Sequence, residues 1–356
     1  MSERFFDSHC HLMAPAFEGN RDAVVERARL AGVREMIFIG TGPATCEQAI
    51  RLAGKYDGGR AALGVSPHDA GKVSPDFFGQ LRGMADHPLV VAIGETGLDY
   101  HYDFSPRDVQ QEVLKKQIAI GQEKNLPMIF HHREAEDDFM RIVEAEGLPE
   151  AGGVMHCFTG GRRMLEWALK QGLHISYSGM ITFKKMDGLR ALLSQTPLER
   201  LLIETDAPYL APHPHRGKTC EPAMVVETAR QAAEVLELEL KDVARITTRN
   251  ARRLFGLEVS ENPKIAYAIG DSLYLNITNQ CCNRCVFCVR DQHRDLKGYE
   301  LHLDREPTLS EVMEASEREN PEDYHEVVFC GFGEPTCRMD VLVETAAALN
   351  RRGCRV

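Results

Sequence analysis

A regular alternation of short apolar runs and longer amphipathic stretches fills residues 1 to about 257. Eight runs rich in apolar or β-branched residues are typical of strands: FFDSH, REMIFIG, AALGVS, LVVAIGE, PMIFHH, GGVMHCF, LHISYSG and RLLIET. Apolar residues at helical spacing lie between them, as in Arg21 to Ala31, Arg107 to Lys124, Arg162 to Gln171 and Pro222 to Leu236. This pattern predicts an α/β fold of the (β/α)8 TIM-barrel class, with a doubly wound open sheet as the alternative.

The composition is that of a globular protein. The chain has 356 residues, of which 43% are hydrophobic and 27% charged, enough for one large domain and part of a second. No apolar run approaches the roughly 20 residues that span a bilayer, and the N-terminus lacks a secretory signal, so we expect a cytoplasmic protein without a membrane partner. The net charge of −11 argues against a broad basic surface for a nucleic-acid duplex but allows a metal site that binds one phosphodiester.

A second domain is expected after a polar linker at residues 258–269. Residues 270–356 contain the strand-like run DSLYLNI, a helix-like stretch from Ser310 to Glu319, the strand EVVFCGFGEP and the helix MDVLVETAAALNRRG. They end at CRV, which is typical of the start of another strand, so we expect a truncated domain. Cysteine is concentrated here, and in a chain with no export signal such a cluster indicates a metal or redox centre.

Polar residues recur where the predicted strands of the first domain end. They are His9, His11, His68, Glu95, His131, His156, Glu204 and Asp206. In a (β/α)8 barrel the carboxyl ends of all strands meet on one face, where the loops build the active site. Four of the histidines with two carboxylates form a ligand set for two divalent cations, Mg, Mn or Zn.

The motifs DSHCHL, GVSPHDA, IGETGLDY, HHREA, MHCFTG and ETDAPYL, followed by TTRNARRLFGL, resemble the TatD family of metal-dependent hydrolases. The resemblance extends in order over residues 1–257. It implies a (β/α)8 barrel with two metal ions and a deoxyribonuclease that trims DNA ends, as a 3′-5′ exonuclease, with RNA as a further substrate. One departure is Ser66, where relatives often have a histidine, and we expect it to affect substrate contact more than metal binding.

The resemblance also implies a distribution of ligands. His9, His11, Glu95 and Asp206 would bind one ion, and Glu95 would bridge to a second ion held by His131 and His156. Asp206 and Glu95 are the expected catalytic residues, Asp206 being placed to act both as a ligand and as the acceptor of a proton from water.

Three further residues are assigned to the substrate side. Arg133 follows the His131 motif and is expected to form a forked pair with a phosphate. His68 is expected to contact substrate or to lie just outside the ligands. Glu204 falls two residues before Asp206 on the same side of its strand, which favours orientation of a ligand.

The segment NQCCNRCVFCVRD carries a second constellation. Cys281, Cys285 and Cys288 have a C-x3-C-x2-C spacing, and three thiolates on one loop can hold three corners of a cubane iron-sulfur cluster. A zinc site is the alternative, but it requires a fourth nearby ligand, for which adjacent Cys282 is poorly suited.

The segment FCGFGEPT follows a predicted strand with Gly331, Gly333 and Glu334. Glycines there let a ligand approach the backbone, and a carboxylate can meet an amino group. Together the two motifs resemble the radical S-adenosylmethionine superfamily over residues 270–356. The resemblance implies a partial β/α barrel with a [4Fe-4S] cluster on the three cysteines, and S-adenosyl-L-methionine with its amino group near Gly331 to Glu334.

Three functions are consistent with these patterns. The first is a two-metal phosphodiesterase of TatD type that acts on DNA and is fused to a radical S-adenosylmethionine domain. In the second, the same metal pair cleaves an ester or amide of a small molecule or an aminoacyl group. In the third, the barrel is a metal-holding docking module for the radical domain.

Overall fold

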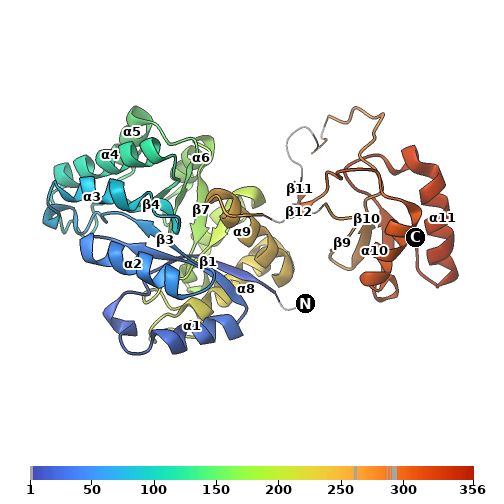
Figure 1. The fold of residues 1–356 in the computed structure, drawn as a ribbon, viewed down its shortest axis with the longest axis horizontal. Helices are drawn as coiled ribbons and strands as arrows, with labels where there is room; N and C mark the ends of the chain where they lie inside the picture. Colours follow the sequence, from blue (N-terminus) through green and yellow to red (C-terminus); the bar gives the residue numbers. More distant parts are fainter. Residues whose placement is uncertain (1–2, 260–262, 287, 289, 291–294) are drawn as a thin grey trace. The chain divides into compact units, whose positions relative to one another are not determined.

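The computed structural model describes residues 3–259, 263–286, 288, 290 and 295–356 and divides the chain into two compact units (Figure 1). Unit 1 comprises Met1–Glu258 and unit 2 comprises Val259–Val356. Among the described residues, no helix combines the length and the apolar character that crossing a membrane requires.

Unit 1 is built around one parallel sheet in which each strand pairs with the next along the chain (Figure 1). The strands are β1 (Phe5–Cys10), β2 (Val33–Gly40), β3 (Gly59–Leu63), β4 (Val90–Asp99), β5 (Met128–Arg133), β6 (Gly153–Met155), β7 (His174–Tyr177) and β8 (Leu201–Ile203). Each of the eight strands overlaps one of the apolar runs expected from the sequence.

The first and last strands meet, which distinguishes a barrel from an open sheet. Cys10 forms a parallel bridge with Ala207. The backbone N–H of His11 donates to the carbonyl of Ala207 at 2.7 Å, and the N–H of Asp206 donates to the carbonyl of His9 at 2.9 Å. The (β/α)8 barrel predicted from the sequence is therefore confirmed for unit 1, and the doubly wound alternative was wrong.

Helices follow the strands and cover the outside of the sheet (Figure 1). They are α1 (Arg21–Leu30), α2 (Pro43–Lys55), α3 (Phe77–Met84), α4 (Arg107–Lys124), α5 (Glu136–Glu146), α6 (Arg162–Lys170), α7 (Asp187–Leu193), α8 (Val225–Leu236) and α9 (Leu240–Leu254). Short 3-10 turns lie in the connections: η1 (Pro15–Phe17), η2 (Ala70–Lys72), η3 (Gly179–Thr182), η4 (Leu198–Arg200) and η5 (Pro222–Met224).

The core has two parts because side chains alternate across each strand. On β2, Met36 and Phe38 belong to the large cluster that also contains helix residues. Ile37 and Ile39 point the other way into a second cluster, which includes Phe6 and Phe255. Phe255 follows α9 and stacks on Phe6 with ring centroids 6.1 Å apart. Nearly continuous apolar strands are therefore needed here, since both faces are buried.

Unit 2 contains a three-stranded sheet in the order β13-β10-β9. Its elements are β9 (Ala266–Ile269), β10 (Ser272–Leu275), β11 (Asp295–Leu296), β12 (Tyr299–Glu300), α10 (Leu309–Arg318), η7 (Pro321–Asp323), β13 (Glu326–Phe329), η8 (Pro335–Arg338) and α11 (Met339–Arg351). Strands β10 and β13 are parallel, so the loops that follow them leave the same edge of the sheet.

Strand β9 lies inside the segment expected to be a linker. It pairs antiparallel with β10 across a tight turn in which Gly270 has a φ of 59°, a conformation that glycine adopts without strain. The buried side chains of β9 belong to the sheet of unit 2, so unit 2 begins earlier than the predicted start at residue 270.

Candidate metal centre

Six side chains from five strands meet at the rim of the barrel in unit 1. His9 lies on β1 and His11 directly follows it; Glu95 lies on β4 and His131 on β5; His156 follows β6 and Asp206 follows β8. The carboxyl ends of these strands are neighbours in a closed sheet, so residues up to about 200 positions apart in the sequence come into contact.

The first group in this cluster is formed by His9, His11 and Asp206. The Nε2 atoms of the two histidines lie 3.2 Å apart. Asp206 Oδ1 lies 3.6 Å from His9 Nε2 and 3.3 Å from His11 Nε2. Glu95 Oε2 lies 3.5 Å from His9 Nε2 and 3.6 Å from His11 Nε2, so it completes the group.

The second group uses the other oxygen of the same glutamate. Glu95 Oε1 lies 3.0 Å from His131 Nδ1 and 3.5 Å from His156 Nε2. These two ring nitrogens are 3.3 Å apart. Glu95 therefore has one oxygen in each group, and its side chain joins them.

The donor atoms suit divalent cations. Ring nitrogens face each other in pairs within each group, and each pair also faces a carboxylate oxygen. Imidazole nitrogen and carboxylate oxygen are ligand types that Zn and other first-row divalent metals accept, and carboxylate also suits Mg and Mn. The residues present thus fit two such ions, with one Glu95 oxygen facing each group.

The two carboxylates are held ionised by their neighbours. Burial raises the pKa of the Glu95 carboxyl, but His156 and the other imidazoles around it outweigh burial and hold that pKa well below its ordinary value. Burial likewise opposes ionisation of Asp206, and the hydrogen bond from His11 helps to lower its pKa. Both side chains are therefore negatively charged near neutral pH, as ligands of a cation would be.

The imidazoles of the cluster differ in the direction in which their pKa values are shifted. Burial, and then His156, lower the pKa of His9, which favours the neutral ring that a cation requires. Burial also lowers the pKa of His11, His131 and His156, but nearby carboxylates overcome it and raise all three above the ordinary value. Protons and cations therefore compete for these rings, so cation affinity should rise with pH.

Asp99, at the end of β4, was missed by the sequence analysis. It is fully buried, and its Oδ2 lies 3.0 Å from His131 Nε2 and 2.9 Å from His68 Nε2. Since His131 turns its other nitrogen toward Glu95, Asp99 lies behind it and orients its ring. The available signal was its even spacing from Glu95 on the same strand, which places both on one face.

Glu204 has the same relation to His156. Its Oε1 lies 3.2 Å from His156 Nδ1 and accepts the backbone N–H of Cys157 at 2.6 Å. The side chain is only 1% exposed. Glu204 follows β8, and its carboxylate lies behind the His156 ring, away from solvent, where it can orient that ring.

The two other substrate-side candidates lie at the edge of the cluster. The His68 side chain is 32% exposed, and its ring centroid is 5.5 Å from that of His131. The Arg133 guanidinium lies over the ring of Tyr102, 4.7 Å from its centroid. Ser66 is buried, at 5% exposure, so it does not reach the surface of the rim.

In unit 2, Cys281, Cys285 and Cys288 follow β10. Cys285 is exposed and the other two are partly exposed, and the N–H of Cys288 donates to the carbonyl of Cys285 at 3.1 Å. Phe287, which lies between two of these cysteines in the sequence, is outside the described residues. Within the described chain, the groups of three or more ligand atoms mutually within 4.8 Å all belong to unit 1, so the cluster assignment stays a prediction.

The glycines after β13 have a local packing reason. A Cβ on Gly331 would meet the Asn276 side chain at 1.9 Å, and one on Gly333 would meet the carbonyls of Thr278 and Gln280 at 2.4 Å. The N–H of Glu334 donates to the carbonyl of Gln280 at 2.7 Å. The loop after β13 therefore packs against the chain leaving β10, which brings the two motifs side by side.

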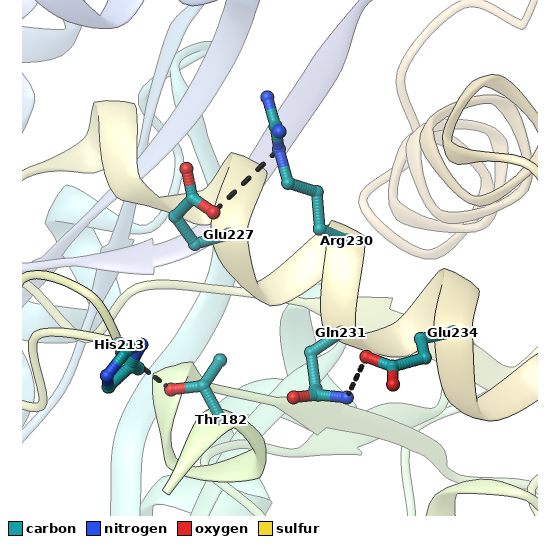
Figure 2. Close-up of a pocket in the computed structure, with 6 residues that line it drawn as sticks. All are labelled: Thr182, His213, Glu227, Arg230, Gln231 and Glu234. Atoms are coloured by element: carbon teal, nitrogen blue, oxygen red, sulfur yellow. Dashed lines mark hydrogen bonds and ion pairs between the residues drawn. The ribbon is translucent and has the colours of Figure 1, made fainter.

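A cavity of about 190 Å³ lies elsewhere in unit 1, beside α8 (Figure 2). It is lined by Thr182, His213, Glu227, Arg230, Gln231 and Glu234. Its polar groups pair with one another: Gln231 Nε2 donates to Glu234 at 2.9 Å, and the backbone N–H of His213 donates to Thr182 Oγ1 at 2.8 Å (Figure 2). It contains none of the predicted site residues.

Comparison with known proteins identifies a family for unit 1. The family model "TatD related DNase" matches residues 6–256. The "Uncharacterized metal-dependent hydrolase YabD" of Bacillus subtilis (strain 168) is 41% identical over 250 residues, which cover 70% of this chain and 98% of that protein. The "3'-5' ssDNA/RNA exonuclease TatD" of Musicola paradisiaca is 39% identical over 260 residues, covering 71% of this chain and 98% of the relative.

A solved structure gives the same result. The structure of YJJV, a TatD homologue from Escherichia coli K12, superposes with a TM-score of 0.69 at 30% identity. The match covers 72% of this chain and 100% of the YJJV chain. The family match covers more than half of the chain and the barrel with its rim. The chain therefore belongs to the TatD family of metal-dependent hydrolases.

Proposed function

We propose that unit 1 is a two-metal phosphodiesterase that removes nucleotides from the ends of DNA, and of RNA as a second substrate. The observation that carries this proposal is the placement of the Glu95 oxygens, one within each group of histidines. The printed name of the Musicola paradisiaca relative, an exonuclease of single-stranded DNA and RNA, supports the choice of substrate.

The proposed ligand sets follow the two groups. His9, His11 and Asp206, with Glu95 Oε2, would hold one ion; His131 and His156, with Glu95 Oε1, would hold the other. Bound there, two divalent ions would supply charge that polarises a phosphoryl oxygen, makes water more acidic and stabilises the leaving oxygen.

Side chains of the protein would accept the proton, orient the histidines and contact the substrate. Asp206 is 14% exposed, so its carboxylate is open to solvent on one side and can accept a proton from water next to the phosphodiester. Asp99 and Glu204 would keep the rings of His131 and His156 in one orientation. Arg133 and His68 border the open side and would contact the phosphate or sugar.

For unit 2 we propose a radical S-adenosylmethionine domain. Cys281, Cys285 and Cys288 would hold the [4Fe-4S] cluster, and the backbone from Gly331 to Glu334 would approach the amino group of S-adenosyl-L-methionine. Two observations support this: both loops leave the same edge of neighbouring parallel strands, and the loop after β13 contacts the chain after β10. About four irons with sulfide after anaerobic purification would agree with the proposal, whereas one zinc without sulfide would replace it.

The test for unit 1 is cleavage of a 3′-labelled single-stranded oligonucleotide with Mg²⁺ or Mn²⁺. His131→Ala and Asp206→Ala should lose most of the activity. His87→Ala is the matched control, because His87 is an exposed histidine just before β4, at the other end of that strand from the rim. Equal rates in the parent and the two rim variants would overturn the assignment, and faster hydrolysis of simple esters than of DNA would favour the small-molecule alternative.

A further inference from the structure

The exposed aromatic side chains of unit 1 are concentrated at the metal rim. Among the described residues of the chain, the phenylalanine, tyrosine and tryptophan side chains that count as exposed are Tyr102, Phe104 and Tyr209, with exposed fractions of 48%, 66% and 58%. Large aromatic rings usually lie buried, and exposed ones at a functional site are candidates for ligand contact.

Two of these rings, Tyr102 and Phe104, stack on each other, and we call this pair the aromatic ledge. The rings are nearly parallel, with an interplanar angle of 14° and centroids 5.3 Å apart. His68 packs edge-on against both, at 5.6 Å from Tyr102 and 5.2 Å from Phe104. His68 also contacts His131 at 5.5 Å between ring centroids, so one residue separates the ledge from a proposed metal ligand.

The backbone that carries the ledge is anchored on both sides. Asp99 Oδ1 accepts the backbone N–H groups of His101 and Tyr102 at 3.0 and 2.8 Å. After Phe104, the buried Ser105 hydroxyl accepts the N–H of Gly71 at 2.9 Å and donates to the carbonyl of His68 at 3.0 Å. The ledge is therefore held in place before any ligand binds, which reduces the entropy lost on binding.

The charge beside the ledge indicates the kind of ligand. The Arg133 guanidinium lies over the ring of Tyr102, 4.7 Å from its centroid, where its planar N–H groups can still bind an anion. On the other side of the centre, the Tyr209 ring lies 6.1 Å from that of His11. Aromatic faces next to an arginine are the combination that binds unpaired bases and their phosphates.

We infer that Phe104 and Tyr102 form a stacking platform for the unpaired base of a nucleotide next to the scissile phosphate. This inference rests on the proposed nuclease function and deepens it by naming the side chains that hold the base. A terminal base that is still paired exposes only its outer face and is held to the partner strand, whereas an unpaired base is free to move onto the ledge. Tyr209 provides a second, separate ring on the side of His11.

The test uses an oligonucleotide whose terminal base is 2-aminopurine, mixed with the metal-loaded full-length protein in a stopped-flow fluorimeter. Stacking should quench the fluorescence within the mixing phase, and cleavage should then release the free nucleotide with a rise in signal. Phe104→Ala and the double variant with Tyr102→Ala should lose the early quench and bind roughly 5- to 100-fold more weakly. Phe104→Tyr should keep the quench.

Two controls separate stacking from general damage. Leu30→Ala removes a side chain that is 79% exposed at the end of α1, just before β2 begins, and should behave as the parent. An oligonucleotide with an abasic terminal nucleotide should be cleaved slowly by the parent and no more slowly by Phe104→Ala.

Release without an early quench in the parent, or an equal loss on the normal and abasic substrates in Phe104→Ala, would overturn the stacking inference. A parent that quenches but never releases nucleotide would overturn the nuclease function and support the platform. Neither quench nor release would overturn both.

Discussion

The rim of the barrel and the cysteine loop gather candidate ligands in different ways. At the rim, side chains from five strands meet, and buried Asp99 and Glu204 lie behind two of the histidines. The candidate ligands of unit 2 lie within eight residues of one loop, from 281 to 288, and Cys285 is exposed. Folding alone thus positions the first set, whereas the second set should depend on its own cluster for order.

The largest effect on cleavage is expected from a substitution of Glu95, whose two oxygens face the two groups of histidines. Glu95→Gln keeps the shape but removes the negative charge between the two groups, so both ions should bind poorly and cleavage should fall on the order of 10³-fold. Bound Mn²⁺ per chain and the rate on single-stranded DNA measure this. Glu47→Gln, at an exposed glutamate of α2, is the matched control; retention of two ions by Glu95→Gln would contradict the bridging role.

Substitutions of Asp99 and Glu204, which lie behind the proposed ligands, should weaken cation binding by a smaller factor. Asp99→Asn and Glu204→Gln leave every proposed ligand present but weaken the hold on His131 or His156, so affinity for the second ion should fall about 10- to 100-fold. Titration with Mn²⁺ should show one weakened site and one unchanged site in each variant. Equal weakening of both sites, or of neither, would show that these carboxylates do not orient a ligand.

A buried histidine of the barrel, His132, should make the folding stability of unit 1 fall in acid. His132 is 9% exposed with no hydrogen-bond partner for Nε2, and burial lowers its pKa to about 4. Because the unfolded chain binds this proton with a pKa near 6.5, stability is complete above that value and is lost as pH falls toward 4.

The matching experiment compares the parent with His132→Phe, which suits the neighbouring ring of Phe139. The parent should lose about 2 kcal/mol more of its free energy of unfolding than the variant between pH 7 and pH 4.5. Chemical denaturation of unit 1 at the two pH values provides the numbers. Parallel losses in the two proteins would mean that His132 is not buried in its neutral form.

The smallest effect is expected on DNA cleavage by the barrel when a residue of the cysteine loop in unit 2 is substituted. Cys285→Ser removes one candidate cluster ligand, so iron content should drop while metal-dependent cleavage of DNA changes less than about twofold, since the proposed ligands at the rim all belong to unit 1. The iron content and the DNA cleavage rate, measured on the same preparation, test this prediction. Loss of cleavage together with iron would show that the two units depend on each other.

Much of unit 1 was predictable because its strands are buried on both faces. Runs such as REMIFIG and PMIFHH therefore stand out as nearly continuous apolar segments, and the polar residues that end them mark the rim. His9, His11 and Glu95 could be grouped from this rule without knowledge of any distance. The closure between β1 and β8 then brings Asp206 beside His9.

The sequence was less informative where a role depends on contacts between strands. Asp99 orients His131 because β4 continues beside β5, with Asp99 paired to Arg133, and this register is not visible in one sequence. Tyr102 and Phe104 look like ordinary loop residues until the anchoring by Asp99 and Ser105 is known. Strand β9 falls within the predicted linker at residues 258–269, and its pairing with β10, which defines it as a strand, is not visible in the sequence.

The central claim is that Glu95 bridges two cations at the rim of the barrel. Anomalous diffraction from crystals of the protein grown with Mn²⁺ tests it most directly. The account predicts two peaks about 3.5 to 4 Å apart, one beside His9, His11 and Asp206 and one beside His131 and His156. A rim without peaks, or a single peak that Glu95 does not contact, would contradict it.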